Sequence, residues 1–482
     1  MEHNASPSVG GTMRVTRRVL VHGAAGAVMP SLVLGAAAAT PSPPPSAMLA
    51  GAQGDGRTDD TEPFRRFLES TLGRSAHVPP GRYSIRGLEI DCHGKDIDLT
   101  FDPGASIEIS GGTGQGAALH FRNPRRVRIE GLVLDAKRNA IVGLAISNER
   151  SAVAGPVLVL RPRVSNLYCP LHRRSAAAGI RISGDFSLAR LEEPRIAQVW
   201  SERLRNPVAR GVLCGRAGAH HGYVRRLEVI WPFIADIGPN ADADGIFHNA
   251  GGAADSETFI EGGRFVDCRK RAIKTQTGRT EWVGGEVYRS AGASAAGTGQ
   301  EVSCQSGRLD ASGQLFTYVN GRDAPMALYG VGNFATATAA PTIIRDFRAV
   351  CEDGAPLKWI AAVVARQPAV GNWAPRRHGS VRIGPGRVEG ASVLGFLTLA
   401  IFGVSDDSVQ AEVDLVGIDA RILSPAQDPR SAIVHGHLDE ETGHRGAVVV
   451  RLIGSPPDTA RARKSLSDDP GLTLQVIDGR HE

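Results

Sequence analysis

The chain has 482 residues, of which 58 are glycine and 29 are proline, and only 5% are aromatic. Its 55 Lys and Arg residues outweigh 50 Asp and Glu residues, which gives a formal net charge of +5. Because the arginines are dispersed and no tract combines bases with aromatics, we expect no nucleic-acid partner. The six cysteines stand singly, without a Cys-x-x-Cys pair, which argues against a zinc site.

The N-terminus is similar to a twin-arginine export signal. Arg17 and Arg18 precede a weakly apolar Gly/Ala-rich run, and the small residues Ala37 to Ala39 suit cleavage. The run is interrupted by Pro30 and is shorter than the ~20 residues of a membrane span, so we expect no stable span after signal removal. The sequence therefore predicts a bacterial protein in the periplasm or secreted. The predicted segments are an export signal over 1–39, a Pro/Ser/Ala linker over 40–49 and one domain over 50–482.

A capping helix and a first strand are predicted over 50–85. Gly54 and Gly56 allow a tight turn, and Thr58 or Asp59 can cap the helix that follows. Apolar residues then recur at helical spacing, at Phe64, Phe67, Leu68 and Leu72. Such an amphipathic helix can cover the open end of a stack of strands.

The segments Gly54-Asp-Gly-Arg-Thr-Asp-Asp-Thr61 and Val78-Pro-Pro-Gly-Arg-Tyr83 resemble the opening of the pectate-lyase-like right-handed β-helix proteins. The resemblance implies an all-β fold, a single-stranded right-handed parallel β-helix, and work on polysaccharide. It does not define the chemistry, since the family includes hydrolases, lyases, epimerases and phage tailspikes. We interpret the acids of the opening, Asp55, Asp59 and Asp60, as turn and cap residues.

The body of the chain alternates apolar and polar residues over short segments, as strands with one buried face do. The segments are 88–90, 97–101, 106–109, 127–129, 132–134, 157–160, 179–182, 227–230, 283–287, 381–383, 412–415 and 448–452. Their groups recur at about the 20 to 30 residues of one β-helix coil, and the two-residue hairpin turns of a sandwich are sparse. A solenoid can also exceed the chain length of a domain with one globular core, because each coil packs only against its neighbours.

We expect terminal coils and a cap over about 395–482. If their coils stack, Cys268 and Cys304 can pair; inward-pointing single thiols are the alternative.

The best candidate site lies in Asn240-Ala-Asp-Ala-Asp-Gly-Ile-Phe-His248 and, about one coil later, Phe265-Val-Asp-Cys-Arg-Lys-Arg-Ala-Ile-Lys274. Aligning Asp244-Gly-Ile246 with Arg271-Ala-Ile273 places two polar clusters on one strand of neighbouring coils. A parallel ladder sets such residues about 5 Å apart.

In part these segments resemble the polygalacturonase-type glycoside hydrolases, in which Asp242 or Asp244 would be the carried-over acid. The second coil departs from that pattern, because Lys270 and Arg271 stand where the family has its aspartate pair. Val434-His-Gly-His437 is too distant to be the family's Gly-His-Gly coil. Hydrolysis needs two carboxyl groups, one as proton donor and one to activate water or attack the sugar. Replacing the aspartate pair with cations removes one of these two functions.

Cations beside a uronic acid suit β-elimination instead, which needs the substrate carboxylate neutralised and a base for the C5 proton. The site resembles that of β-helix polysaccharide lyases, which use Lys or Arg as base and calcium or a basic side chain as neutraliser. We take Lys274 as the base, since its strand position points outward, with Lys270 and Arg271 beside it. Neighbouring like charges lower the pKa of such a lysine. The predicted partner is an acidic polysaccharide.

Several alternatives remain at this point. Asp242 and Asp244 are also compatible with a hydrolase pair, a calcium site between coils, or simple turn residues. His248, with His220 and His221 one coil earlier, fits either an acid or base or a structural residue. A non-catalytic tailspike-like surface and an epimerase are further possibilities. The oligomeric state does not follow from the sequence.

Overall fold

The computed structural model describes most of the chain beyond the N-terminal segment. The described residues are 46, 50–111, 115–173, 175–202, 207–215, 222–239, 242–293, 299–319, 325–332, 341–352, 357–366, 380–402, 410–422, 434–438, 447–453 and 472–477. The predicted export signal lies outside them, as does the predicted linker over 40–49 apart from residue 46. Within the described ranges, no helix is both long and apolar enough to cross a membrane.

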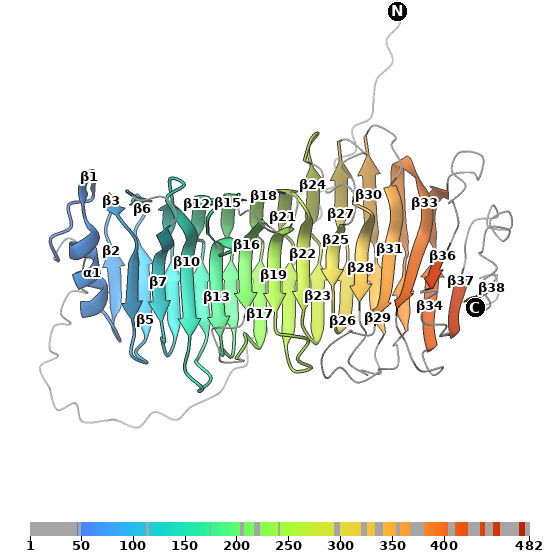
Figure 1. Ribbon diagram of the computed structural model, residues 1–482, viewed down its shortest axis with the longest axis horizontal. Coiled ribbons are helices and arrows are strands. Elements are labelled where there is room, and N and C mark those ends of the chain that lie inside the picture. Colours follow the sequence, from blue (N-terminus) through green and yellow to red (C-terminus); the bar gives the residue numbers. More distant parts are fainter. Residues whose placement is uncertain are drawn as a thin grey trace, which may run out of the picture. The chain divides into compact units, whose positions relative to one another are not determined.

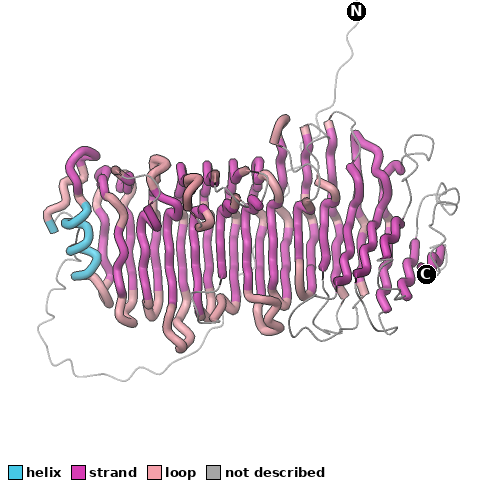
Figure 2. The backbone as a smooth tube through the Cα atoms, viewed as in Figure 1, coloured by secondary structure: helices cyan, strands magenta, loops and turns pink. Residues whose placement is uncertain are grey.

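The described strands form three parallel ladders (Figures 1 and 2). Ladder 1 consists of β2 (Ser75–Val78), β5 (Ile97–Phe101), β8 (Val127–Glu130), β11 (Val157–Leu160), β14 (Ala189–Glu192), β17 (Arg226–Ile230), β20 (Glu257–Glu261), β23 (Arg279–Val283), β26 (Arg308–Ser312), β29 (Thr342–Arg345), β32 (Val381–Ile383), β34 (Gln410–Val416), β37 (Ala447–Ile453) and β38 (Leu472–Ile477).

Ladder 2 consists of β1 (Asp55–Asp59), β3 (Gly81–Ile85), β6 (Ala105–Ile109), β9 (Val133–Asp135), β12 (Arg163–Cys169), β15 (Arg195–Ser201), β18 (Phe233–Gly238), β21 (Arg264–Cys268), β24 (Glu286–Arg289), β27 (Leu315–Tyr318), β30 (Phe347–Cys351), the start of β33 (Gly386–Phe402) and β35 (Ile418–Ile422).

Ladder 3 consists of β4 (Leu88–Asp91), β7 (Gln115–Arg122), β10 (Ala140–Asn148), β13 (Ala177–Gly184), β16 (Val208–Gly215), β19 (Asp242–Asn249), β22 (Arg271–Gln276), β25 (Gln300–Cys304), β28 (Ala327–Gly332), β31 (Leu357–Arg366), the rest of β33 and β36 (Val434–Leu438).

From β2 to β36 each coil contributes one strand segment to every ladder, so the fold is the predicted right-handed parallel β-helix. On ladder 1, Thr258 pairs with Thr280 after 22 residues and Ala189 with Leu227 after 38 residues, so coil length varies more than predicted. The inward rows are aliphatic, as in Leu144, Ile180, Val212, Ile246 and Ile273 of ladder 3. Each coil buries its apolar row only against its two neighbours, which is how a chain of this length keeps one continuous core.

Helix α1 (Thr61–Ser70) covers the first coils, as predicted (Figure 1). It packs against β3 and β4 and buries Phe64, Phe67 and Leu68 in the main core. The Phe64 ring lies 5.5 Å from that of Tyr83 on β3, centroid to centroid. The helix therefore continues the apolar core beyond the last strand at this end.

The acids of the opening bind nearby backbone and side-chain groups, as predicted for turn residues, but the predicted helix cap at Thr58 or Asp59 is wrong. The N-cap position is Asp60, whose carboxylate instead accepts hydrogen bonds from the backbone N–H groups of Gln53 (2.7 Å) and Gly54 (3.0 Å). Asp59 accepts from the Thr61 N–H at 3.1 Å, and the Thr58 hydroxyl donates to Asp55 at 2.9 Å. These carboxylates hold the turn in place.

The structure corrects one predicted strand, and of the two alternatives for Cys268 and Cys304 it contradicts the disulfide and confirms the single buried thiols. The segment 283–287 is not one strand: Val283 ends β23, Glu286 begins β24, and the turn between them is made by Gly284 and Gly285, whose φ of +67° and +100° L side chains rarely adopt. The thiols of Cys268 and Cys304 are free and buried, since β21 belongs to ladder 2 and β25 to ladder 3. Stacking of coils aligns residues within a ladder and not between ladders.

Candidate functional site

The two predicted polar segments form adjacent rungs of ladder 3. Asp244 on β19 pairs with Arg271 on β22, and Ile246 pairs with Ile273, in the register predicted from the sequence. On the other side, Asp244 pairs with Arg210 on β16. Three successive coils therefore present Arg210, Asp244 and Arg271 in one row.

A corner of small residues follows this row immediately. Gly211, Gly245 and Ala272 occupy equivalent places, and a Cβ at Gly245 would lie 2.6 Å from the carbonyl oxygen of Ala272. Only glycine lets the backbones of neighbouring coils approach so closely. The bend interrupts the strand alternation, because the buried residues Ala243 and Asp244, then Gly245 and Ile246, are consecutive. This is why Asp244 is buried without joining the aliphatic core row.

The side chains of the row form an ion-pair network with Asp242. Arg210 Nη2 lies 2.6 Å from Asp242 Oδ2, and Arg210 Nη1 lies 3.2 Å from Asp244 Oδ2. Arg271 Nη1 lies 3.3 Å from Asp242 Oδ1 and 3.1 Å from Asp244 Oδ1. The side chain of Asp244 is fully buried and that of Arg210 is 2% exposed. We call Arg210, Asp242, Asp244, Arg271 and Lys274 the ion-pair cluster.

Lys274 lies at the more open edge of the ion-pair cluster. Its Nζ is 3.7 Å from Asp242 Oδ1 and 4.8 Å from the centroid of the Phe247 ring, which pairs with Lys274 in the ladder. Arg210 Cζ lies 5.1 Å from the same centroid, so Phe247 is placed against two cations. The Lys274 side chain is 13% exposed and that of Asp242 18%, which leaves both within reach of a molecule on this surface.

The environment shifts the pKa of both groups. Burial lowers the pKa of Lys274 below its usual 10.5, although Asp244 and Asp242 oppose the shift. Burial opposes ionisation of Asp242, but the charges of Arg210 and Lys274 hold its pKa below the usual 3.8. The lysine is thus easier to deprotonate than in water, and the aspartate harder to protonate.

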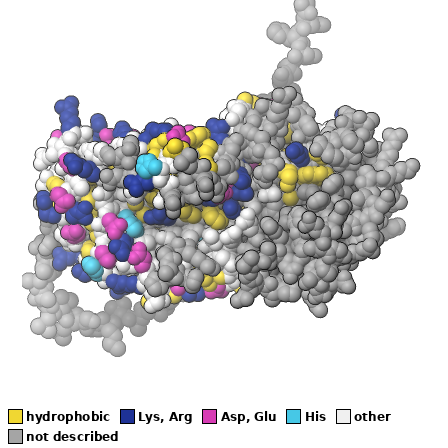
Figure 3. Space-filling model, in the orientation of Figure 1, with side chains coloured by type: hydrophobic (Ala, Val, Ile, Leu, Met, Phe, Trp, Pro, Cys, Tyr) yellow, Lys and Arg dark blue, Asp and Glu magenta, His cyan; other side chains and the backbone are white. Residues whose placement is uncertain are grey.

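Lys270 stands just before β22 and adds a further cation. Its backbone N–H donates to the Ala243 carbonyl at 3.1 Å. Burial and, next, the neighbouring charge of Arg271 lower its pKa. Four cations and two carboxylates leave this surface with a net charge of +2. On the face shown in Figure 3, described basic and acidic side chains are interspersed.

His248 is not brought to the ion-pair cluster. Its side chain is fully buried, with Nδ1 2.9 Å from Thr258 Oγ1 and Nε2 2.9 Å from the Val224 carbonyl oxygen. Burial lowers the pKa of His248 to about 4, so the ring is neutral and donates from Nε2 to the carbonyl. These contacts make it a structural link between coils. His220 and His221 lie outside the described residues, as does Asn240.

The residues present do not fit the predicted calcium ion. Calcium takes six to eight oxygen ligands, whereas the carboxylates of Asp242 and Asp244 already face the guanidinium groups of Arg210 and Arg271. Nowhere among the described residues do three or more His, Cys, Asp or Glu side chains gather as metal ligands. A cation here would have to displace two buried arginines.

Arg210 was missed by the sequence reasoning, although a signal exists. Arg210-Gly-Val212 repeats the pattern of Asp244-Gly-Ile246 and Arg271-Ala-Ile273. The step from Arg210 to Asp244 is 34 residues, longer than the expected coil, while that from Asp244 to Arg271 is 27. An alignment of the small residues Gly211, Gly245 and Ala272, in place of an assumed coil length, identifies Arg210 from the sequence.

No protein-family model matches the chain, and none of the curated proteins does. Among solved structures, it is similar to ORF18 of Geobacillus virus E2, with 12% identity over 85% of this chain and a TM-score of 0.34. The chain spans 62% of that viral protein.

Two further similar structures are A-modules of mannuronan C-5 epimerases of Azotobacter vinelandii. The AlgE6 module has 11% identity over 91% of this chain and 100% of its own, with a TM-score of 0.33. The AlgE4 module has 10% identity over 90% and 95%, with a TM-score of 0.23. At such identities the likeness does not extend to activity.

Proposed function

We propose that this protein cleaves a uronic-acid polymer by β-elimination at the ion-pair cluster. The observation that carries the proposal is Lys274: a lysine of lowered pKa, partly exposed, on a surface where cations outnumber carboxylates. A neutral amine is a competent base, and the surrounding positive charge favours an anionic sugar. With the export predicted for residues 1–39, the substrate is an extracellular polymer.

In the proposed reaction, Lys274 Nζ removes the C5 proton of a uronate while Lys270 neutralises the sugar carboxylate. The C5–H electron pair forms the C4–C5 double bond, and the C4–O glycosidic bond breaks. The proton on Lys274 then passes to the leaving oxygen, so no water is consumed. Arg271, held by Asp242 and Asp244, supports the same charge from behind.

Hydrolysis by Asp242 and Asp244 is less well supported. A glycosidase needs one carboxyl group that is protonated and one that is free to act on water or sugar. Asp244 has no exposed surface, and the lowered pKa of Asp242 keeps it ionised. Both also face guanidinium groups. The carboxylates therefore suit a holding role for the arginines better than a catalytic one.

The test is incubation of the purified protein with a panel of uronate polymers. Elimination creates an unsaturated product that absorbs in the ultraviolet, together with one new reducing end per cleavage. Reducing ends without absorbance would instead indicate hydrolysis. A change of C5 configuration by NMR without chain cleavage would indicate an epimerase, and binding without any product a carbohydrate-binding protein. Each of these three outcomes contradicts the proposal.

Lys274→Ala is the decisive variant, because loss of a general base costs about 10²- to 10⁴-fold in rate. Its matched control is Lys137→Ala. Lys137 is a surface lysine, 48% exposed and paired with Asp135, four coils before β22. We expect the control to retain full activity. Equal activity of the two variants would contradict the assignment of Lys274.

A further inference from the structure

A second polar constellation lies on ladder 3, nearer the N-terminal end. Glu89 on β4 pairs with His120 on β7, and His120 pairs with Ala145 on β10, two residues before Ser147. The outward side chains of three successive coils thus meet. None of these residues belongs to the ion-pair cluster.

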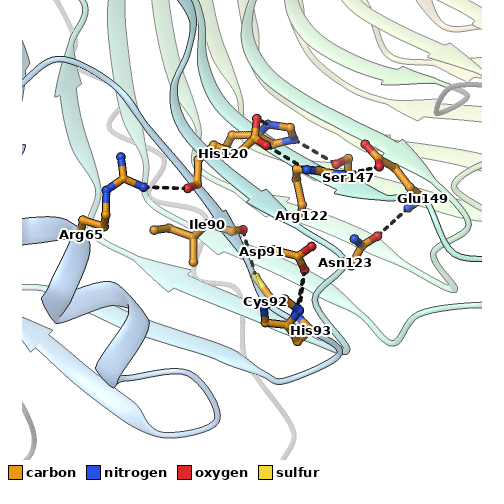
Figure 4. Close-up of polar contacts among 11 residues, drawn as sticks. Arg65, Ile90, Asp91, Cys92, His93, His120, Arg122, Asn123, Ser147 and Glu149 are labelled. Carbon is orange, nitrogen blue, oxygen red and sulfur yellow. Dashed lines mark hydrogen bonds and ion pairs between the residues drawn. The ribbon is translucent and has the colours of Figure 1, made fainter.

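The contacts link carboxylate, imidazole and hydroxyl in series. His120 Nδ1 lies 3.0 Å from Glu89 Oε2, and His120 Nε2 lies 2.9 Å from Ser147 Oγ. Figure 4 shows the imidazole directed at the serine. A carboxylate only accepts, so Nδ1 carries the proton that it donates to Glu89, and Nε2 accepts from the serine hydroxyl. This is the polarity that a histidine needs to act as base toward a serine.

The carboxylate of Glu89 is itself fixed. Arg122 Nη1 lies 3.0 Å from Glu89 Oε1, and its Nη2 lies 2.7 Å from Glu149 Oε2 (Figure 4). Burial opposes ionisation of Glu89, but the hydrogen bonds from Arg122 and His120 hold its pKa below the usual 4.5. Glu89 is therefore charged at neutral pH, where it orients the imidazole.

The imidazole of His120 is neutral, as a general base must be. Its side chain is 14% exposed, and burial lowers its pKa below 6.5, opposed by Glu89. The charges of Arg181 and Arg122 lower it further. The ring is thus neutral at pH 7. Ser147 is buried, with 6% of its surface exposed, whereas the side chain of Glu89 beyond His120 is 56% exposed.

The guanidinium of Arg181 lies near Glu89, His120 and Ser147, where it can stabilise an oxyanion. Arg181 on β13 pairs with Ala145, so His120 and Arg181 lie on either side of that small residue. Burial lowers the pKa of Arg181, yet a guanidinium stays charged at neutral pH. Among the described residues no carboxylate forms an ion pair with it, although it is partly buried. A half-buried, uncompensated cation favours an anionic species at this place.

We propose that Ser147, His120 and Glu89 form an esterase site that hydrolyses acyl esters, with Ser147 as nucleophile, His120 as general base and Glu89 as positioning residue. Ser147 Oγ attacks the ester carbonyl while its proton passes to His120 Nε2, and Arg181 faces the developing oxyanion. The bond to the alcohol breaks, and His120 protonates the departing oxygen. Water, deprotonated by His120, then attacks the acyl-serine, which releases the carboxylic acid and restores Ser147.

The position suggests O-acyl groups of a saccharide as the substrate class. The ladder row that begins with Glu89 and His120 continues through Arg181 and Phe247 to Lys274. Five rungs of about 4.8 Å separate His120 from Lys274, or roughly 24 Å. A polymer lying along this face would meet both sites. The esterase site shares no residue with the proposed elimination, so each can fail alone.

The first test is covalent labelling with a fluorophosphonate, followed by peptide mass spectrometry. We expect one label, on Ser147. The matched control is Ser183, which pairs with Ser147 on the next coil and is more exposed; where the coil before Ser147 has His120, the coil before Ser183 has Ala145. Ser147→Ala should abolish labelling and Ser183→Ala preserve it. Absence of label, or labelling that survives Ser147→Ala, overturns the proposal.

The second test is hydrolysis of p-nitrophenyl acetate and of an O-acetylated polysaccharide. Ser147→Ala should lower kcat at least about 10³-fold and Arg181→Gln about 10²- to 10³-fold. Both substrates unchanged in Ser147→Ala would contradict the proposal. Uronate cleavage should be unaffected by Ser147→Ala, which separates this site from the elimination.

The role of Glu89 has its own readout. In the wild-type protein, kcat/KM should rise with pH through the lowered pKa of His120, below 6.5. Because Glu89 raises that pKa, Glu89→Gln should move the midpoint to lower pH as well as reduce kcat about 10²- to 10⁴-fold. A reduced rate with an unmoved midpoint would mean that Glu89 does not act through His120.

Discussion

Asp244 is the residue on which the ion-pair cluster depends most, and Asp244→Asn tests this directly. The substitution keeps the side-chain shape and removes the charge. It leaves Arg210, 2% exposed, and Arg271, 9% exposed, facing an amide at the places now 3.2 and 3.1 Å from carboxylate oxygens. Breaking a buried ion pair on one side costs about 3 to 5 kcal/mol, because the remaining charge stays desolvated.

The loss should be local, since each coil of a solenoid contacts only its neighbours. Hydrogen exchange by mass spectrometry measures it: amides of β16, β19 and β22 should exchange about 10²- to 10⁴-fold faster, while those of β4 and β7 change little. The matched control is Glu257→Gln, which removes an exposed pair with Arg226 (2.7 Å) worth about 0 to 1 kcal/mol. Unchanged protection in Asp244→Asn would refute the reasoning, as would an equal effect of the control.

Three other predictions concern acid stability, packing and thiols. Asp242 has a lowered pKa, so its ion pairs contribute stability above about pH 4 that is lost as pH falls through the folded-state pKa; Asp242→Asn should flatten the fall in thermal midpoint below pH 4. Gly245→Ala places a Cβ 2.6 Å from a carbonyl oxygen and should cost about 1 to 3 kcal/mol in thermal unfolding, whereas at Gly215 nothing lies within 4 Å and Gly215→Ala should be neutral. Burial raises the pKa of the Cys268 and Cys304 thiols, so a thiol reagent should react with them only after the protein is denatured. Because both thiols are free, the reaction should not require prior reduction. If it does require a reductant, the two cysteines form a disulfide.

Much of the scaffold was predictable because its signals are local. Period-two alternation marks strands whether or not their partners are known, and β5, β11 and β32 have the bounds expected from the sequence. The pairing of Asp244 with Arg271 was also predictable, since both precede a small residue and an isoleucine. The segment 283–287 was misassigned because the pair Gly284-Gly285, which is a turn signal, was taken as part of a single strand.

The candidate sites were harder to predict, because side-chain direction depends on the corner. Simple alternation places Asp244 inward, but the bend at Gly245 turns it against Arg210 and Arg271. His248 lies two residues after the core residue Ile246, so alternation places it inward, but the sequence gives no warning that Thr258 and the Val224 carbonyl receive it.

The contact between Glu89, His120 and Ser147 could not be predicted from the sequence for a different reason. Its members are separated by 31 and 27 residues and belong to no recognisable motif. Only the ladder register brings them together, and coil lengths that vary from 22 to 39 residues among the described strands prevent that register from being counted along the chain. Sites of this kind follow from the folded ladder alone.

Whether an acidic sugar binds and reacts over β22 can be seen in a structure of Lys274→Ala with a uronate oligosaccharide. We expect the sugar carboxylate within hydrogen-bond distance of Lys270 or Arg271, with C5 facing the space left by the lysine side chain. A sugar bound on another ladder, or one whose C5 faces away from position 274, would contradict the proposed elimination.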